Sequence, residues 1–264
     1  MPIIVFLYFI CFISRIFKLR VASIAFMLYL DFMKKLLALI LLIAFLLTSC
    51  TVTQKIALSD KNSGSSESDI HVEQFFVDVL EDFSEFLPSS DKSIMDEAMT
   101  SFANQLTKAN STKIVDFEKT GENSYILEFE YTNIDSLISE LGAKNQSIIS
   151  SKDKSFSFYV DINNFEELTK IVPFLADPNF EVYGPLYNQG TSEEDYLDMI
   201  YYLLGEEGPE AIENGTVSID VKVPGTITKV DNAAKISTDT ARFTFPIIDF
   251  LLLNEPLHFT VNWK

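Results

Sequence analysis

Few side chains in this 264-residue sequence have the types and spacing that catalysis or metal binding requires. The two histidines, His71 and His258, stand outside any HExxH motif, and GxSxG, Walker-loop and paired-cysteine motifs are also missing. Carboxylates are numerous enough for a two-carboxylate hydrolase. However, the cluster at 193–198 falls at a predicted helix start, where negative charge favours the helix dipole. We therefore expect no enzyme, no metal site and no cofactor.

The reactive side chain with the most informative surroundings is the thiol of Cys50. It closes an uncharged apolar run, Leu36–Leu47, that follows Lys34 and Lys35. A membrane-spanning helix needs about 20 apolar residues, so this run is too short to span a bilayer. Basic residues, a short apolar run and small residues before a cut are typical of a secretory signal peptide.

The end of this run, Leu47-Thr48-Ser49-Cys50, resembles the lipobox of bacterial lipoproteins. The resemblance implies cleavage between Ser49 and Cys50, a diacylglyceryl group on the thiol and, usually, acylation of the new amino terminus. Two or three acyl chains would anchor the protein stably to a membrane. The alternatives are an ordinary secretory signal or an anchor helix that contains a cysteine. Thr51 is not the aspartate that retains some lipoproteins in the inner membrane, which favours the outer membrane of a bacterial cell envelope.

The sequence divides into three parts. Residues 1–32 form a second apolar block placed before a complete signal, because Met33 opens a signal of ordinary size by itself. We expect 1–32 to be an over-extended start or, alternatively, an extra apolar segment. Residues 33–49 are the predicted lipoprotein signal peptide, and residues 50–264 are long enough for a single domain with a sizeable core.

The charge balance is strongly acidic. The whole sequence has a net charge of −18, and the part before Cys50 carries five basic residues and one acidic residue. The mature chain therefore keeps 20 less 5 basic and 38 less 1 acidic side chains, a net charge of −22. Such a chain repels nucleic acid, which needs basic patches. Cys50 is its one cysteine, so the core must stabilise it without disulfides.

The hydrophobic periodicity predicts an α+β fold. Thr51–Asp60 alternates as a strand does, 61–69 is a predicted polar loop, and His71–Leu87 is a predicted amphipathic helix. Further predicted helices span 92–108, 134–141, 164–175 and 193–204, with Asn133 and Ser192 as N-caps. Further predicted strands span 112–118, 124–132, 154–162, 215–223, 226–230, 235–245 and 257–263. We expect antiparallel strands from both chain ends to share one sheet, packed by amphipathic helices.

The predicted helix 193–204 is apolar nearly all round, whereas a surface helix should show a polar face. An aromatic segment, 180–187, comes just before it. One interpretation is a helix buried on both sides in a dry core. The other is a cavity for an acyl chain or another apolar ligand, since tyrosine suits a cavity mouth. The candidate ligand-binding residues are Tyr183, Tyr187, Tyr196, Met199, Ile200 and Leu203.

The two ends of the mature chain resemble the LppM-type domain of bacterial lipoproteins. The opening resemblance is a strand directly after the cysteine, the loop "SGSS" and the helix "EQFFVDVLEDFSEFL". The closing one is "SIDVKVPGTITKVDN" followed by "ARFTFPI". The resemblance implies a small, non-enzymatic α+β domain that handles lipids or glycolipids at the envelope. Residues 120–210 do not align, so no ligand residue carries over.

Two functions fit these observations. The first is an envelope lipoprotein that binds a lipid or other apolar ligand. The second is a surface or periplasmic lipoprotein that binds an envelope protein and has a dry core. In both, the acyl chains make the membrane a partner.

Overall fold

The structure is a computed structural model that describes residues 51–59, 62–74, 76–78, 93–176 and 181–264. Residues Ser49–Lys264 belong to one compact unit. The segment 1–32, the signal 33–49, the cleavage site at Ser49 and Cys50, and most of the predicted helix 71–87 lie outside the described residues. These assignments stay predictions.

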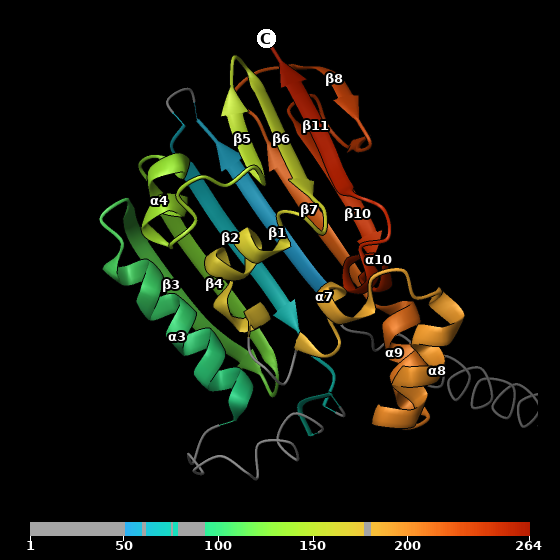
Figure 1. The fold of residues 1–264 in the computed structure, drawn as a ribbon. Helices are drawn as coiled ribbons and strands as arrows, with labels where there is room; N and C mark the ends of the chain where they lie inside the picture. The colour runs from blue at the N-terminus through green and yellow to red at the C-terminus, as the bar shows by residue number, and fades with distance from the viewer. Residues whose placement is uncertain (1–50, 60–61, 75, 79–92, 177–180) are drawn as a thin grey trace, which may run out of the picture. The chain divides into compact units, whose positions relative to one another are not determined.

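Two β-sheets form the framework of the described part of the chain (Figure 1). The larger sheet has the strand order β3-β4-β2-β1-β7-β10-β9, and the smaller has the order β5-β6-β11-β8. The strands are β1 Thr51–Leu58, β2 Gly64–His71, β3 Thr112–Gly121, β4 Ser124–Tyr131, β5 Ile149–Lys152, β6 Ser155–Val160, β7 Thr216–Lys222, β8 Ile227–Asp231, β9 Ala234–Lys235, β10 Thr240–Pro246 and β11 Leu257–Trp263.

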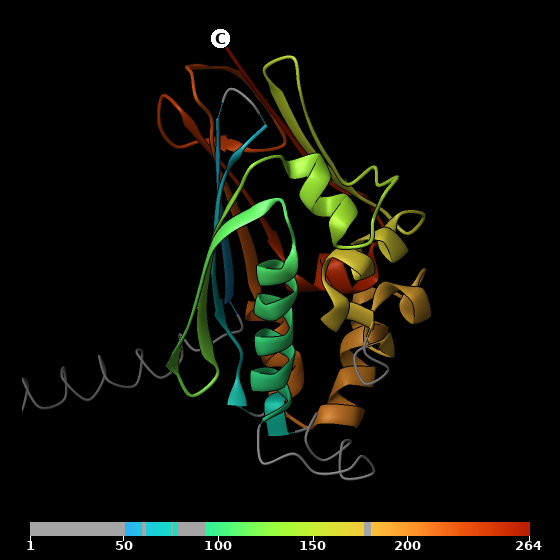
Figure 2. The ribbon, with the colours of Figure 1, turned by 90° about the vertical axis from the view of Figure 1, so that its left-hand side faces the viewer.

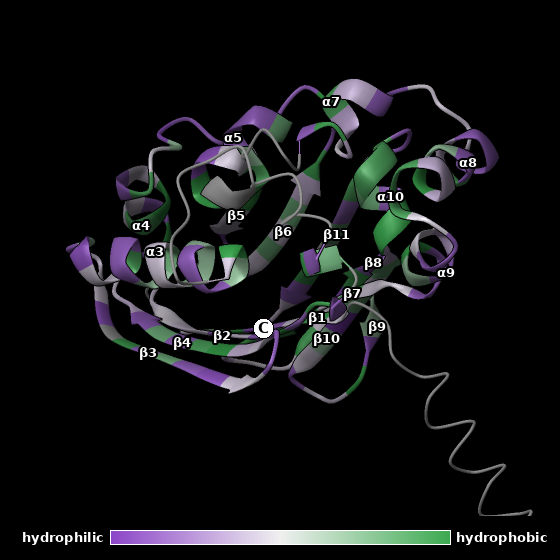
Figure 3. Ribbon diagram, turned by 90° about the horizontal axis from the view of Figure 1, so that it is seen from below, coloured by the Kyte–Doolittle hydropathy of each residue, from purple (hydrophilic) through white to green (hydrophobic). Residues whose placement is uncertain are grey.

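The described helices lie on one side of the larger sheet (Figures 2 and 3). They are α3 Ile94–Lys108, α4 Ile134–Glu140, α5 Phe165–Ile171, the 3-10 helix η1 Pro173–Ala176, α7 Pro185–Asn188, α8 Glu193–Leu204, α9 Glu207–Asn214 and α10 Ile247–Leu252. None of the helices in the described ranges is long and apolar enough to cross a membrane. The fold is α+β, as the sequence predicts.

Strands from both ends of the chain share the larger sheet, as predicted, but the pair that joins the two ends is parallel rather than antiparallel. β1 pairs antiparallel with β2 on one side and parallel with β7 on the other. The other strand pairs in the described residues are antiparallel. The last strand, β11, pairs with β6 and β8 in the smaller sheet instead, so the C-terminal strands divide between two sheets.

The prediction of a polar loop over 61–69 is wrong for most of its length, because β2 occupies 64–71 between β1 and β4. Its serines and acids suggest a loop, but every second side chain faces solvent. The inward hydroxyls of Ser66 and Ser68 find a partner in Gln54 of β1. The Gln54 amide donates to Ser66 Oγ at 2.6 Å, and Ser68 Oγ donates to Gln54 Oε1 at 2.6 Å. A buried polar strand is stable when its polar groups are paired in this way.

The inner face of the larger sheet is covered in two different ways. Near β7 and β10 the smaller sheet packs on it, and the rings of Phe243 and Phe259 stack with centroids 5.0 Å apart. Near β4, helices α3 and α4 pack on it, with Leu106 and Leu127 among the fully buried side chains there. Asn133 caps α4, as predicted, because its Oδ1 accepts from the backbone N–H of Ser136 at 2.9 Å.

The outer face of the larger sheet carries a row of charged side chains across neighbouring strands. Glu128, Glu67, Lys55, Asp220 and Arg242 are register partners from β4 to β10. Lys55 pairs with Glu67, and Arg242 donates two hydrogen bonds to the Asp220 carboxylate at 2.6 and 2.7 Å. The helices lie on the opposite side, so this face meets solvent (Figure 3).

Candidate functional site

The site forms where the chain turns from α8 into α9. Ser192 caps α8, as predicted, and its Oγ accepts from the backbone N–H of Asp195 at 3.1 Å. The acidic first turn of α8 complements the positive end of the helix dipole. The helix ends at Gly205, which has φ of +81°, a backbone conformation that glycine adopts without strain.

One side of α8 is closely packed. Tyr196 and Ile200 are almost completely buried against Tyr183, Ile248 and Leu252. The Tyr196 hydroxyl donates to the backbone carbonyl of Tyr183 at 2.8 Å. Burial raises the pKa of Tyr196, so this phenol stays neutral. We call these five buried side chains the α8 cluster.

The six residues predicted to bind an apolar ligand do not lie on one surface. Tyr183, Tyr196 and Ile200 belong to the α8 cluster, and Met199 is half-buried beside them. Tyr187 and Leu203 are exposed, Tyr187 to 65% and Leu203 to 47%. The structure thus brings four of them together in a packed contact and places two on the surface. A ligand role for any of them stays a prediction.

A short glycine-containing helix, α9, packs on α8 next to the α8 cluster and shares Ile200 with it. A Cβ atom at Gly208 would lie 2.8 Å from Ile200 Cγ2 and 3.0 Å from Leu204 Cβ, so glycine permits the close approach of the two helices. The sequence pattern does not predict α9, because glycine and proline, here Gly208 and Pro209, are typical helix breakers. Proline is tolerated in the first turn, where its missing N–H has no partner to lose. Pro209 in the first turn is therefore the sequence signal that could identify α9.

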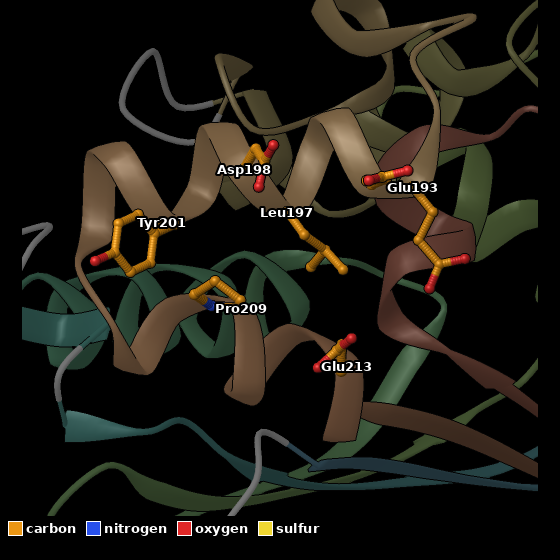
Figure 4. Close-up of a pocket in the computed structure, with 7 residues that line it drawn as sticks. Glu193, Leu197, Asp198, Tyr201, Pro209 and Glu213 are labelled. Atoms are coloured by element: carbon orange, nitrogen blue, oxygen red, sulfur yellow. The ribbon is translucent and has the colours of Figure 1, made fainter.

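Between α8 and α9 lies an open groove of about 560 Å³ (Figure 4). Its apolar strip comes from Leu197 and Tyr201 of α8, which point toward Pro209 of α9. Its remaining lining consists of carboxylates from both helices: Glu193, Glu194, Asp198 and Glu213. We call this feature the α8–α9 groove.

The α8–α9 groove combines negative charge with an apolar strip. Its seven lining residues include four acids and no basic residue. No group of three or more metal-ligating side chains close enough to hold an ion occurs in the parts of the chain that the structure describes. Because of its charge and its apolar strip, the groove can attract a lysine or arginine side chain, and it repels an anionic headgroup.

The two histidines lie away from this groove in the strands. His71 ends β2, and its Nδ1 is 2.9 Å from Ser124 Oγ. His258 lies in β11 between the buried Leu257 and Phe259, on the opposite face from both, as predicted, and stacks on Tyr159. Each histidine thus has an ordinary structural neighbour.

Comparison with known proteins gives a weak structural similarity. No family model and no curated protein matches the sequence. Among solved structures, the chain is similar to the folded domain of the LppM protein of Mycobacterium tuberculosis, determined by NMR. The identity is 9% and the TM-score 0.39, over 81% of this chain and 89% of that chain. At this identity no residue role carries over.

Proposed function

We propose that this protein is a non-enzymatic lipoprotein of the bacterial cell envelope that binds a basic segment of a partner protein in its α8–α9 groove. Lipid chains on Cys50 would anchor it to the membrane, with the outer membrane favoured over the inner. The observation that carries the proposed activity is the groove itself, an apolar strip flanked by four carboxylates from two helices.

The chemistry of the groove supports the protein-binding function more than the lipid-binding one. A fatty acid or a phospholipid carries an anionic headgroup, which would face Glu193, Glu194 and Glu213. A lysine or arginine side chain would instead lay its stem along Leu197 and Pro209 and bring its charge to these acids. An arginine could also stack on the ring of Tyr201. The packed α8 cluster on the other side of α8 agrees with the protein-binding alternative.

The expected affinity is modest and depends on salt. Exposed charge pairs contribute about 0–1 kcal/mol each, so several pairs and the apolar strip must act together. Screening lengths of about 8 Å at physiological ionic strength weaken such contacts further. A groove of this kind suits reversible docking of a partner held at the same membrane.

The groove is tested with two fluorescent probes: an amphipathic peptide of lysine and leucine, and a fatty acid. The wild-type protein should bind the peptide more weakly as salt rises, and it should leave the fatty acid unbound. The double variant Glu194→Gln with Glu213→Gln should weaken peptide binding and flatten its salt dependence. Fluorescence anisotropy measures all of these.

A matched control removes two carboxylates elsewhere. Glu128→Gln with Glu130→Gln changes the net charge equally on the outer face of the larger sheet, and peptide binding should stay as in wild type. Equal weakening in both double variants would show general charge attraction and sink the groove proposal. Uptake of the fatty acid, with the peptide left unbound, would favour the lipid-binding function instead.

The anchor needs a separate test. Cys50→Ser removes the thiol that the lipobox chemistry requires. The variant should lose the added acyl mass and stop partitioning into detergent, while wild type shows both. Normal partitioning of the variant would end the lipoprotein proposal, whatever the peptide experiment gives.

A further inference from the structure

The proposed anchor has almost no spacer before the folded domain. β1 begins at Thr51, one residue after Cys50, and consecutive Cα atoms lie about 3.8 Å apart. Thr51 is held on both sides, opposite His71 of β2 and Thr216 of β7. Lipid chains on Cys50 would therefore leave from the middle of one end of the larger sheet and hold that end at the membrane.

The helices α8 and α9 lie at this same end. α9 stops at Asn214, and β7 begins at Thr216 opposite Thr51. Because α9 has eight residues, it reaches about 12 Å from there to the turn that joins it to α8. Figures 1 and 2 both place α8 and α9 toward the end of the molecule opposite the C-terminus.

The last helical turn of α8 exposes apolar and aromatic side chains close to the connection between α8 and α9. Tyr202 is 91% exposed and Leu203 47%, next to Tyr201 of the α8–α9 groove, which is 51% exposed. An exposed tyrosine and leucine on one turn are more than the single scattered apolar residues of an ordinary surface. Tyrosine prefers an interface where its ring is in an apolar layer and its hydroxyl meets water, as in the headgroup region of a bilayer.

We propose that the last turn of α8, through Tyr202 and Leu203, inserts into the headgroup region of the bilayer that holds the acyl chains. The inference rests on the proposed lipid anchor. The acyl chains supply the membrane affinity, and the short tether keeps α8 at a high effective concentration near the bilayer. Tyr202 then needs only to set the orientation of the domain on the bilayer. Glu206 and Glu207 follow the turn, so the leaflet it fits is zwitterionic rather than anionic.

A tryptophan scan with the mature, lipidated protein tests this orientation. The variant Tyr202→Trp is placed on phosphatidylcholine vesicles with and without brominated acyl chains, which quench nearby indoles. Wild-type Trp263, the one tryptophan of the sequence, lies at the end of β11 by the C-terminus and gives the baseline. Tyr187→Trp is a matched control, an exposed tyrosine before the far end of α8.

The expected result is a blue shift and a loss of intensity on brominated vesicles for Tyr202→Trp alone. Equal quenching of Tyr187→Trp and Tyr202→Trp would overturn the inference, because no single face would then meet the bilayer. So would unquenched Tyr202→Trp in a protein that floats with the vesicles and carries the acyl mass. A protein without that mass would overturn the proposed anchor and this inference together. Equal thermal melts of the variants and wild type show that the fold is kept.

Discussion

The core between the two sheets and the α8 cluster differ in size and in composition. Among the described residues, the first has 16 buried side chains, contributed by both sheets and by their connections, whereas the α8 cluster has five. The first is built from aliphatic side chains and phenylalanine. The second contains two tyrosines, and α8 turns its other side to an open groove. The comparison separates a stable framework from a smaller unit at its end that presents the candidate site.

The difference in size implies a difference in stability. Local opening has a free energy that falls with the number of buried apolar contacts, so small peripheral clusters open before large cores. We expect α8 and α9 to open without the sheets, while the sheets open only on global unfolding. Substitutions in the two regions should therefore differ in how much they lower the free energy of unfolding. They should also differ in how many helices and strands exchange their amide hydrogens faster.

The largest expected effect is in the core between the sheets. Phe259 stacks with or leans on Phe156, Phe158 and Phe243, with ring centroids 5.0 to 5.9 Å apart. Phe259→Ala should lower the free energy of unfolding by about 3–5 kcal/mol. Urea unfolding measures the loss, and hydrogen exchange should speed up in the sheets as well as in α8. A loss below about 1 kcal/mol would mean that this core is loosely packed.

A smaller and more local effect is expected in the α8 cluster. Tyr196→Phe removes the hydroxyl that donates to the Tyr183 carbonyl and leaves that carbonyl unpaired. The cost should be about 1–3 kcal/mol. Exchange should accelerate in α8 and stay unchanged in β11. Equal acceleration in β11 would show that the two regions unfold as one unit, and the distinction between them would fail.

The helix cap gives the next effect. Ser192→Ala removes the side chain that accepts from the Asp195 backbone N–H and should cost about 0.5–2 kcal/mol. Ser192→Asn keeps an acceptor and should remain close to wild type. Amide exchange at the start of α8 distinguishes the two variants. Identical exchange in both would mean that packing alone fixes this helix end.

The smallest effect is expected in the groove. Glu213 is exposed and lines the groove from α9, so Glu213→Gln should change the free energy of unfolding by no more than about 0.5 kcal/mol. The same variant should weaken binding of the basic peptide. A loss of stability above about 1 kcal/mol, measured by thermal melting, would show that Glu213 supports the framework rather than a ligand.

The sequence predicts those elements whose signals are local. The ends of α8 and the Ser192 cap follow from residues within one turn of each other, and the α+β class follows from the periodicity. β2 could not be predicted, because the hydroxyls of Ser66 and Ser68 depend on Gln54 of another strand. α9 could not be predicted either. Glycine is favoured at position 208 because its backbone lies close to Ile200 of α8, and this contact appears only in the folded chain.

The candidate site also has one part that local sequence signals predict and another part that depends on contacts in the fold. The apolar character of 193–204 identified the right helix from the sequence alone. Which of its sides would be buried could not be read, because that depends on α9 and α10, and neither helix was predicted. The acids at 193–198 were interpreted as a helix start, which they are. Three of these acids also line a groove together with Glu213, and this arrangement can be seen only in the folded structure.

The position of β1 between β2 and β7 has a consequence for biogenesis. Its hairpin partner β2 follows at once, but β7 comes after most of the domain has been synthesised. Closing so long a loop makes this pairing slow. The larger sheet therefore cannot close until β7 has been synthesised. Until then the β7 side of β1 stays an open strand edge, which can pair with another chain.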